Sequence, residues 1–249
     1  MSAASDAPVP SLFERTRIIV GDAGIARMRR SRIFLAGLGG VGSFAAEALA
    51  RMGVGELVLA DFDEVAPSNL NRQLVALNST VGRKKIEVMA ERIRDINPDV
   101  RLTLLDRFLS AEDMDRLLDR RFDYVVDAID SLNSKVALIA AARDKGLPVA
   151  ASMGAGGRLD PGRLRIGDLM DSEVCPLARQ VRRRLRRRGI ERGVLAVWST
   201  EMPCAPLPPE PVGHGRPRAV NGTVSYMPAL FGMTLAGSVI QRLLSAPAD

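Results

Sequence analysis

The stretch RIFLAGLGGVGS, residues 32–43, decides the fold of this chain. Its first half is apolar and rich in residues that favour a strand. Its second half carries four glycines in the pattern G-x-G-x-x-G, namely Gly37, Gly39, Gly40 and Gly42. Helix formers without a breaker continue to residue 52. The stretch therefore predicts a strand, a tight turn and a helix whose first backbone amides bind the phosphate oxygens of a nucleotide.

The same order of strand and helix repeats along the chain. Further strands are predicted at 56–61, 100–106, 124–129 and 148–152, and helices at 81–96 and 131–145. Alternation of this kind produces parallel strands joined by crossover helices on both faces of a sheet. We therefore expect an α/β fold with a doubly wound, mostly parallel Rossmann-type sheet and a C-terminal α/β extension.

The chain is expected to form a single domain over 13–249, preceded by a flexible tail at 1–12. The nucleotide-binding core covers 13–157 and begins with two short helical pieces. The extension covers 158–249, where the expected elements are a strand at 163–167, an arginine-rich helix at 176–188, a strand at 194–199, an irregular proline-rich loop at 203–217 and a helix at 228–244.

The net charge of +6 is concentrated in one segment. Residues 179–192 hold eight arginines and one glutamate, which leaves the rest of the chain at −1. A basic helix on a nearly neutral body favours an anionic partner, and nucleic acid is the commonest one. The alternative is a solvated helix face. The candidates for contact with nucleic acid are Arg182, Arg183, Arg186 and Arg187.

Two cysteines, Cys175 and Cys204, exclude a disulfide framework and a four-cysteine zinc site, so no zinc is expected. Either thiol could be reactive or inert. Residues 219–240 carry no charge, and we interpret them as part of a buried C-terminal helix rather than a membrane span. The first residues lack the apolar run of a signal peptide, so we expect a cytoplasmic protein without stable membrane insertion.

Polar residues after the second strand point to a nucleotide with several phosphates. Asp61 ends that strand, where a carboxylate can accept hydrogen bonds from ribose hydroxyls, and Asp63 is a weaker candidate. These residues alone fit an NAD-dependent oxidoreductase as well as an ATP enzyme. Four further residues favour ATP because a triphosphate needs arginine and lysine to neutralise its charge: Asn69, Arg72, Gln73 and Lys85. Lys84 fits a surface charge equally well.

Two acidic residues follow the fourth strand, at the edge where ligands bind in open parallel sheets. A carboxylate there can hold Mg²⁺ beside the phosphates of ATP. Asp127 could instead cap the next helix, so Asp130 is the chosen metal ligand.

Several motifs together resemble the ubiquitin-activating-enzyme-like adenylyltransferases: GLGGVGS at 37–43, DFD at 61–63, NLNRQ at 69–73, VGRKK at 81–85, INP at 96–98 and DAIDS at 127–131. Within that superfamily, AEALAR at 46–51, EVMAERI at 87–93 and GAGGRLDP at 154–161 are similar to the tRNA threonylcarbamoyladenosine dehydratases.

The resemblance implies ATP-dependent adenylation of the threonyl carboxylate on a modified tRNA adenosine, followed by ring closure and release of AMP. It implies that Asp61 holds the ribose, that Asn69, Arg72 and Lys85 serve the phosphates, and that Asp130 holds the metal. It also implies a homodimer in which an N-terminal arginine reaches the partner's ATP, with Arg15 the first candidate and Arg17 the second. A sulfur-transfer protein is a possible partner.

Two alternatives stay open. One is adenylation of the C-terminus of a ubiquitin-like sulfur carrier, which the missing C-x-x-C pairs and the arginine-rich segment make less favoured. The other is a nucleotide-binding module without catalysis, which the candidates at Arg72, Lys85 and Asp130 argue against.

Overall fold

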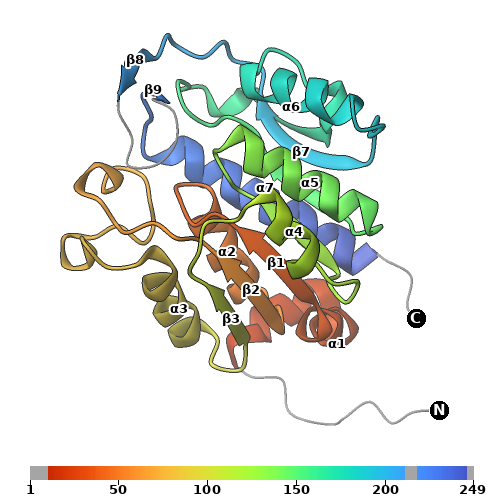
Figure 1. The fold of residues 1–249 in the computed structure, drawn as a ribbon. Helices are drawn as coiled ribbons and strands as arrows, with labels where there is room; N and C mark the ends of the chain where they lie inside the picture. The colour runs from red at the N-terminus through yellow and green to blue at the C-terminus, as the bar shows by residue number, and fades with distance from the viewer. Residues whose placement is uncertain (1–10, 211–217, 246–249) are drawn as a thin grey trace.

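A single seven-stranded sheet forms the centre of the protein (Figure 1). The computed structural model describes residues 11–210 and 218–245. In spatial order the strands are β3 (Arg101–Leu105), β2 (Glu56–Ala60), β1 (Arg32–Ala36), β4 (Tyr124–Asp127), β5 (Val149–Ser152), β7 (Val194–Ser199) and β6 (Leu164–Asp168). All neighbours are parallel except β6, which runs antiparallel to β7. The expected doubly wound, mostly parallel α/β fold is thereby confirmed.

Strand β1 explains why the central strands read as continuous apolar runs. Its side chains alternate between the two faces: Ile33 and Leu35 belong to one hydrophobic core, and Phe34 and Ala36 belong to the other. All four are fully buried. A strand covered on both faces has no position for an exposed polar side chain, so alternation of polar and apolar residues is absent.

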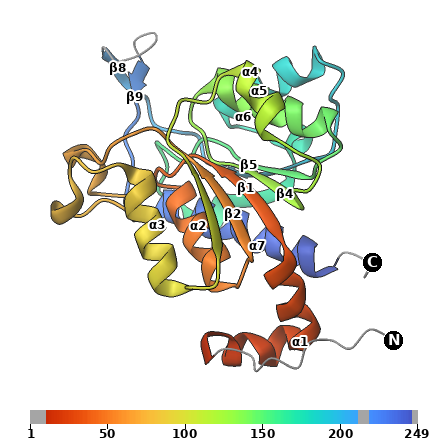
Figure 2. The ribbon, with the colours of Figure 1, turned by 60° about the horizontal axis from the view of Figure 1, so that its bottom comes forward.

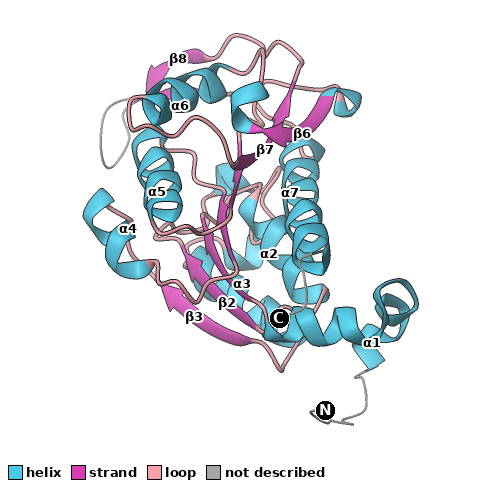
Figure 3. Cartoon of the chain, turned by 90° about the vertical axis from the view of Figure 1, so that its right-hand side faces the viewer, coloured by secondary structure: helices cyan, strands magenta, loops and turns pink. Residues whose placement is uncertain are grey.

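Helices cover both faces of the sheet. One face packs against α2 (Gly42–Arg51), α3 (Lys85–Ile96) and α7 (Tyr226–Ser245), and the other packs against α4 (Ala111–Leu117), α5 (Leu132–Asp144) and α6 (Pro176–Arg186). Figures 2 and 3 show these two layers with the strands between them. Two layers of helices around one sheet produce the two cores.

Helix α7 is long and apolar enough to cross a membrane by length and composition alone. In the fold, however, Phe231, Leu235 and Val239 are fully buried in the core shared with α2 and the sheet. The expected buried C-terminal helix is confirmed, and it begins two residues earlier than the sequence suggested, at Tyr226.

The N-terminal helix α1 (Glu14–Arg30) projects at one end of the molecule (Figure 2). It is bent at Gly21, whose φ of 67° lies in the left-handed region that glycine adopts without strain. The two predicted helical pieces are therefore confirmed as one bent helix. A single turn of 3₁₀ helix, η1 (Ser11–Phe13), precedes it.

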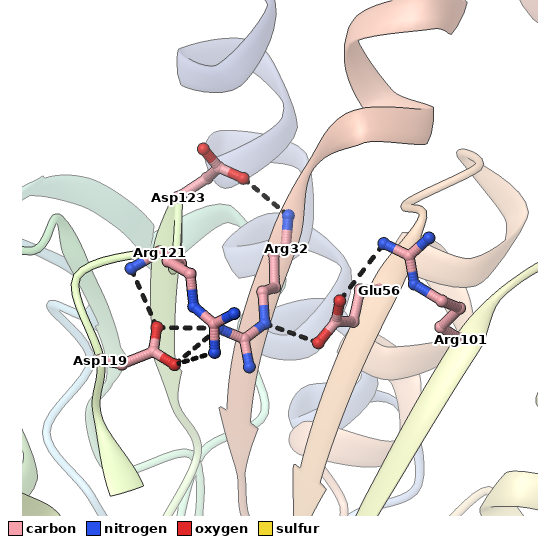
Figure 4. A network of polar contacts seen from close by, with 6 residues as sticks. All are labelled: Arg32, Glu56, Arg101, Asp119, Arg121 and Asp123. Carbon is pink, nitrogen blue, oxygen red and sulfur yellow. Dashed lines mark hydrogen bonds and ion pairs between the residues drawn. The ribbon is translucent and has the colours of Figure 1, made fainter.

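A network of charged side chains closes the edge of the sheet where the strands begin (Figure 4). Arg32, Glu56 and Arg101 are the first residues of three neighbouring strands and lie in register. Arg32 Nε donates to Glu56 Oε1 at 2.5 Å, and its Nη1 donates to Asp119 at 2.8 Å. Arg121 also donates to Asp119. The network therefore lies at the edge of the sheet opposite the carboxyl ends of the strands.

Two predicted elements were wrong in part. Helix α3 begins at Lys85 rather than at 81, because Gly82 has a φ of 83° and the backbone there pairs with Val65. The expected irregular loop contains a strand, β8 (Leu207–Glu210), which pairs with β9 (Arg218–Val220). Prolines are tolerated in β8 because a two-stranded ribbon leaves one edge of each strand unpaired. Residues 211–217 of that loop lie outside the described residues.

Short 3₁₀ turns complete the connections: η2 (Pro67–Asn69), η3 (Asn78–Thr80), η4 (Pro161–Arg163) and η5 (Leu169–Asp171). The predicted arginine-rich helix is confirmed as α6, which ends at Arg186, two residues before the predicted end.

Candidate active site

A cavity of about 780 Å³ opens at the carboxyl ends of the strands. The strand order reverses between β1 and β4, and a parallel sheet forms its ligand crevice at such a reversal. The cavity is lined by the glycine turn after β1, the acidic segment after β2, residues 128–131 after β4, the last residue of β5 with residues 153–156, and the start of α6. It is therefore large enough and correctly placed for a nucleotide and part of a second substrate.

Close packing disfavours a side chain at three positions of the turn, and at Gly40 a Cβ would lie 2.9 Å from Pro228 Cβ. A side chain at Gly37 would lie 2.7 Å from the carbonyl oxygen of Ala128, and the φ of Gly37 is 91°. A side chain at Gly42 would lie 1.7 Å from the carbonyl oxygen of Gly37. Gly39 has no such neighbour, and a Cβ there would meet only Gln73 Nε2 at 3.8 Å. Its backbone therefore stays open to a ligand in the cavity.

Asp61 is fixed by two backbone amides. Leu38 N donates to Asp61 Oδ2 at 2.5 Å, and Asp63 N donates to Oδ1 at 2.9 Å. Burial raises the pKa of Asp61, and the positive charge of Lys85 opposes that rise. Lys85 itself is buried and donates from Nζ to Asp63 Oδ2 at 2.8 Å. This pair links the start of α3 to the end of β2 at the cavity wall.

The segment 69–73 forms another part of the wall. Asn69 is buried and accepts a hydrogen bond from Ala66 N at 3.1 Å, so it shapes the turn. Arg72 Nη1 donates to the carbonyl oxygen of Ser68 at 2.8 Å and to Asn71 Oδ1 at 2.9 Å. Burial lowers the pKa of the Arg72 guanidinium. Both bonds use one nitrogen, so the other donors of the guanidinium stay available for phosphate oxygens.

Gln73 carries an orphaned acceptor. Its Oε1 is buried and has no hydrogen-bond partner among the described residues, although the side chain lines the cavity. A buried acceptor without a donor costs free energy unless a ligand supplies one. Gln73 thus fits a position that contacts a bound nucleotide.

The two acidic residues after β4 have different environments. Asp127 is fully buried and accepts from Lys135 Nζ at 2.7 Å and from Ile129 N at 3.0 Å. Burial raises the pKa of Asp127, and the charge of Lys135 opposes this. Lys135 also donates to the carbonyl oxygen of Ser152 at 2.9 Å, so the pair ties the ends of β4 and β5 together. Asp130 is exposed and lines the cavity.

Other predicted site residues do not line the cavity of their own chain. Arg15 is exposed on α1. Arg182 is half-buried and donates from Nη1 to the carbonyl and hydroxyl oxygens of Ser172, so it holds α6 in place. Arg183, Arg186 and Arg187 are exposed.

The cavity also contains residues that the sequence did not identify as candidates. Arg158 lines it and is only 3% exposed, yet no spacing pattern marks this residue beyond its place in the motif at 154–161. Cys175 is buried and lines the cavity, whereas Cys204 is exposed and does not. Lys84 lies outside the cavity and forms ion pairs with Glu64 and Asp106 at 3.9 and 3.6 Å, as expected of a surface charge.

A doubly wound sheet with a glycine turn, an arginine and a lysine around one cavity defines a nucleotide-binding protein of the adenylating class. The model of the ThiF family matches residues 13–249, and the chain belongs to the ThiF family.

Within the family, the chain is similar to proteins named tRNA threonylcarbamoyladenosine dehydratase. It is 37% identical to the one from Bacillus subtilis (strain 168), over 93% of this chain and 94% of that protein. The crystal structure of the E. coli tRNA N6-threonylcarbamoyladenosine dehydratase in complex with ATP matches with a TM-score of 0.85 and 37% identity, covering 94% of this chain and 93% of that one.

A second kind of relative matches only part of the chain. The sulfur carrier protein ThiS adenylyltransferase of E. coli (strain K12) is 38% identical over 138 residues, which is 55% of this chain and 55% of that protein. The Bacillus subtilis dehydratase matches nearly the whole chain, and this coverage distinguishes it from the sulfur carrier adenylyltransferase.

Proposed function

We propose that this chain binds ATP in the cavity and uses it to dehydrate threonylcarbamoyladenosine in tRNA to a cyclic nucleoside. One observation carries the proposal: a single cavity joins the glycine turn with Arg72, Lys85 and Asp130. The chain is also similar over nearly its whole length to enzymes named for this reaction. Asp61 and Gln73 would contact the nucleoside part of ATP, and Asp63 would hold Lys85 in place.

The first step is attack by a carboxylate oxygen of the substrate on the α-phosphorus of ATP. The bond to the bridging oxygen breaks, and pyrophosphate leaves with the electron pair. Negative charge builds on the leaving group, so Arg72 and Lys85 would stabilise the transition state. Asn69 would support this indirectly because its side chain shapes the turn that carries Arg72.

The second step closes the ring. A nitrogen of the substrate's urea group attacks the acyl carbon, and AMP leaves with one of the former carboxylate oxygens. The nitrogen's proton passes to solvent, so the nucleoside loses the elements of water. A nucleophile tethered to the acyl adenylate has a high effective concentration, so the protein needs chiefly to hold the two ends and exclude bulk water.

A magnesium ion fits the donor groups of this cavity. The described parts of the chain contain no group of three or more His, Cys, Asp and Glu side chains arranged around a metal. Magnesium at ATP sites commonly uses one or two carboxylates together with phosphate oxygens, and Asp130 supplies such a carboxylate. When bound, the ion would neutralise charge on the phosphates.

Helix α6 is the proposed contact for tRNA. Its first residues, Pro176 and Leu177, line the cavity, and its exposed arginines follow within one helix length, roughly 16 Å at 1.5 Å per residue. Arg183, Arg186 and Arg187 would bind backbone phosphates beside the modified nucleoside. Arg182 would contribute through the position of the helix rather than by direct contact.

A second copy of the chain is the proposed occupant of two exposed apolar surfaces. Ile18 and Ile19 on α1 are 79% and 86% exposed. A groove of about 330 Å³ between α2 and α7 is lined by Phe44, Leu230 and Met233 among others. A homodimer that covered these surfaces could bring Arg15 of one protomer to the ATP of the other. A cytoplasmic location stays a prediction from the first residues of the sequence, and a sulfur-transfer partner stays a prediction from the resemblance.

The test compares AMP release from ATP and Mg²⁺ with two tRNA samples, one bearing threonylcarbamoyladenosine and one unmodified. The proposal expects AMP only with the modified tRNA, together with a nucleoside lighter by one water molecule. AMP release that requires a sulfur-carrier peptide instead would replace the proposal with that activity. No AMP with any carboxylate would indicate a module without catalysis.

A further inference from the structure

The cavity has an end that the chemistry of ATP does not use. The glycine turn, Arg72 and Lys85 belong to the ends of β1 and β2. Beyond β4, the wall is built from residues 153–156 after β5, Arg158 and the start of α6. Since β5 lies on the far side of β4 from β1, this end is where a second substrate would approach the nucleotide.

Arg158 is a buried cation with unused donors. It is 3% exposed, and its Nη1 donates to the carbonyl oxygens of Gly154 at 2.5 Å and Gly156 at 2.9 Å. Its Nε and Nη2 have no hydrogen-bond partner among the described residues. A buried guanidinium is expected to be paired, because leaving its N–H groups without acceptors is unfavourable. The missing partner is therefore expected to be an anionic ligand.

The start of α6 provides a second, independent preference for an anion. Cys175 occupies the N-cap position without a side-chain hydrogen bond to the helix, and the first turn holds no acidic residue. The free backbone amides of a helix N-terminus attract negative charge. Val174, just before the helix, has a φ of 63°, which is strained for a β-branched residue and directs the chain into this wall.

The two features meet at Gly154. A Cβ placed there would lie 3.6 Å from Arg158 Nη1 and 3.7 Å from Cys175 Sγ. The guanidinium and the helix N-terminus therefore flank one glycine at the same end of the cavity. A Cβ at residue 154 would be in ordinary van der Waals contact with both groups, so Gly154 marks the place where they come together.

We propose that Arg158 and the N-terminus of α6 form the subsite that binds the carboxylate of the acyl substrate before it attacks ATP. This inference rests on the proposed function. The carboxylate must approach the negatively charged α-phosphate, and a cation beside it reduces their mutual repulsion. One carboxylate oxygen would accept from Nε or Nη2 of Arg158, and the other would remain free to attack.

The experiment measures binding in the presence of an ATP analogue whose α–β bridging oxygen is replaced by a methylene group, so that pyrophosphate cannot leave and no reaction occurs. The probes are a tRNA bearing the modified nucleoside and the same tRNA with the carboxylate converted to its methyl ester. Arg158→Gln and Arg158→Lys are compared with wild type. The matched control is Arg165→Gln, because Arg165 is exposed and its Nη1 also donates to two carbonyl oxygens, those of Gly162 and Leu164, outside the cavity.

Wild type and Arg165→Gln are expected to bind the acid about tenfold or more tightly than the ester, as for a charged hydrogen bond. In Arg158→Gln this ratio should fall towards one, and Arg158→Lys should retain part of it. An unchanged ratio of acid to ester affinity in Arg158→Gln overturns the inference. If both affinities fall by the same factor, the ratio is also unchanged, and the result would indicate contact with an RNA phosphate. Unchanged affinity for the ATP analogue verifies that the variants are folded.

If Arg158→Gln does not fold, the ratio in Arg158→Lys decides, and a ratio equal to that of wild type overturns the inference. Failure of the proposed function is recognised separately. Wild type would then release no AMP with the modified tRNA. Release of AMP by wild type together with equal binding of acid and ester overturns only the carboxylate subsite.

Discussion

Lys135 and Asp127 form an ion pair without solvent exposure, and removing one partner should strongly destabilise the protein. Lys135→Met keeps a side chain of similar length and leaves the Asp127 carboxylate buried without its cation. Breaking a buried pair in this way costs about 3–5 kcal/mol of unfolding free energy. The pair also ties β4 to the carbonyl oxygen of Ser152 in β5, so the loss should reduce affinity for ATP as well.

The assay is urea unfolding of wild type, Lys135→Met and the control Lys84→Met at a series of pH values. Lys84 pairs at the surface, so its variant should lose less than about 1 kcal/mol. Adding Asp127→Asn to Lys135→Met should restore part of the loss because it removes the unpaired charge.

The dependence on pH has a defined sign. Lys135 opposes the rise in the pKa of Asp127 that burial causes, so its removal raises this pKa further. A carboxyl whose pKa is higher in the folded than in the unfolded protein becomes protonated in the folded protein first as the pH falls. Protonation removes the unpaired buried charge and so stabilises the folded protein. The loss of unfolding free energy in Lys135→Met relative to wild type should therefore become smaller as the pH falls from about 8 to about 5. A deficit equal to that of Lys84→Met, or one that grows towards low pH, would refute the reasoning.

Three further outcomes are expected. Arg72→Ala should lower the rate of AMP release by about 10²–10³-fold, as for loss of one preorganised charge donor, and leave the melting temperature nearly unchanged; a rate close to that of wild type would exclude a role on the phosphates. Arg183→Gln with Arg187→Gln should reduce the slope of log K against log salt for tRNA binding by about 0.7–0.9 per lost phosphate contact, and an unchanged slope would assign these residues to a solvated face. Burial of Asp119 acts to raise its pKa, but hydrogen bonds from Arg121 and Arg32 lower that pKa to about 2. The ionised Asp119 carboxylate therefore stabilises the fold near neutral pH, and this stabilisation is lost as the pH falls through about 2. Asp119→Asn should therefore lose less stability than wild type between about pH 4 and about pH 2 in urea titrations, and parallel acid limbs would contradict this.

The parts of the fold that were predictable have strong local signals. Gly37 and Gly42 are required by close backbone packing, and a sequence pattern can represent that requirement. The central strands are buried on both faces, so their apolar runs are unambiguous. The predicted start of α3 was too early because Arg83 and Lys84 favour a helix, while Gly82 has a φ of 83° and the segment pairs with Val65 outside the helix. That pairing is a tertiary contact, which local propensity does not report.

In the candidate site, too, some residues have a local sequence signal and others depend on tertiary contacts. Asp130 follows the end of β4, and the rule that ligands bind at that edge predicts it. Arg72 and Lys85 are predicted from the charge of a triphosphate, and both line the cavity. Arg158 was not predicted because the observations behind its proposed role appear only in the fold: burial beside two carbonyl oxygens, and donors that have no partner among the described residues. Arg182 belongs to an arginine run, which does not show that its Nη1 donates to Ser172; its contact with nucleic acid stays a prediction. Only the fold reveals which arginines of a run point outwards.

The most direct test of adenylation uses modified tRNA whose threonyl carboxylate carries a heavy oxygen isotope. In the proposed reaction one carboxylate oxygen becomes the oxygen that links the acyl group to AMP, and it leaves with AMP when the ring closes. Mass spectrometry should therefore find one heavy oxygen in AMP and one in the cyclic nucleoside for each turnover. AMP without the label would mean that the carboxylate never attacked the α-phosphorus, and the central claim would be wrong.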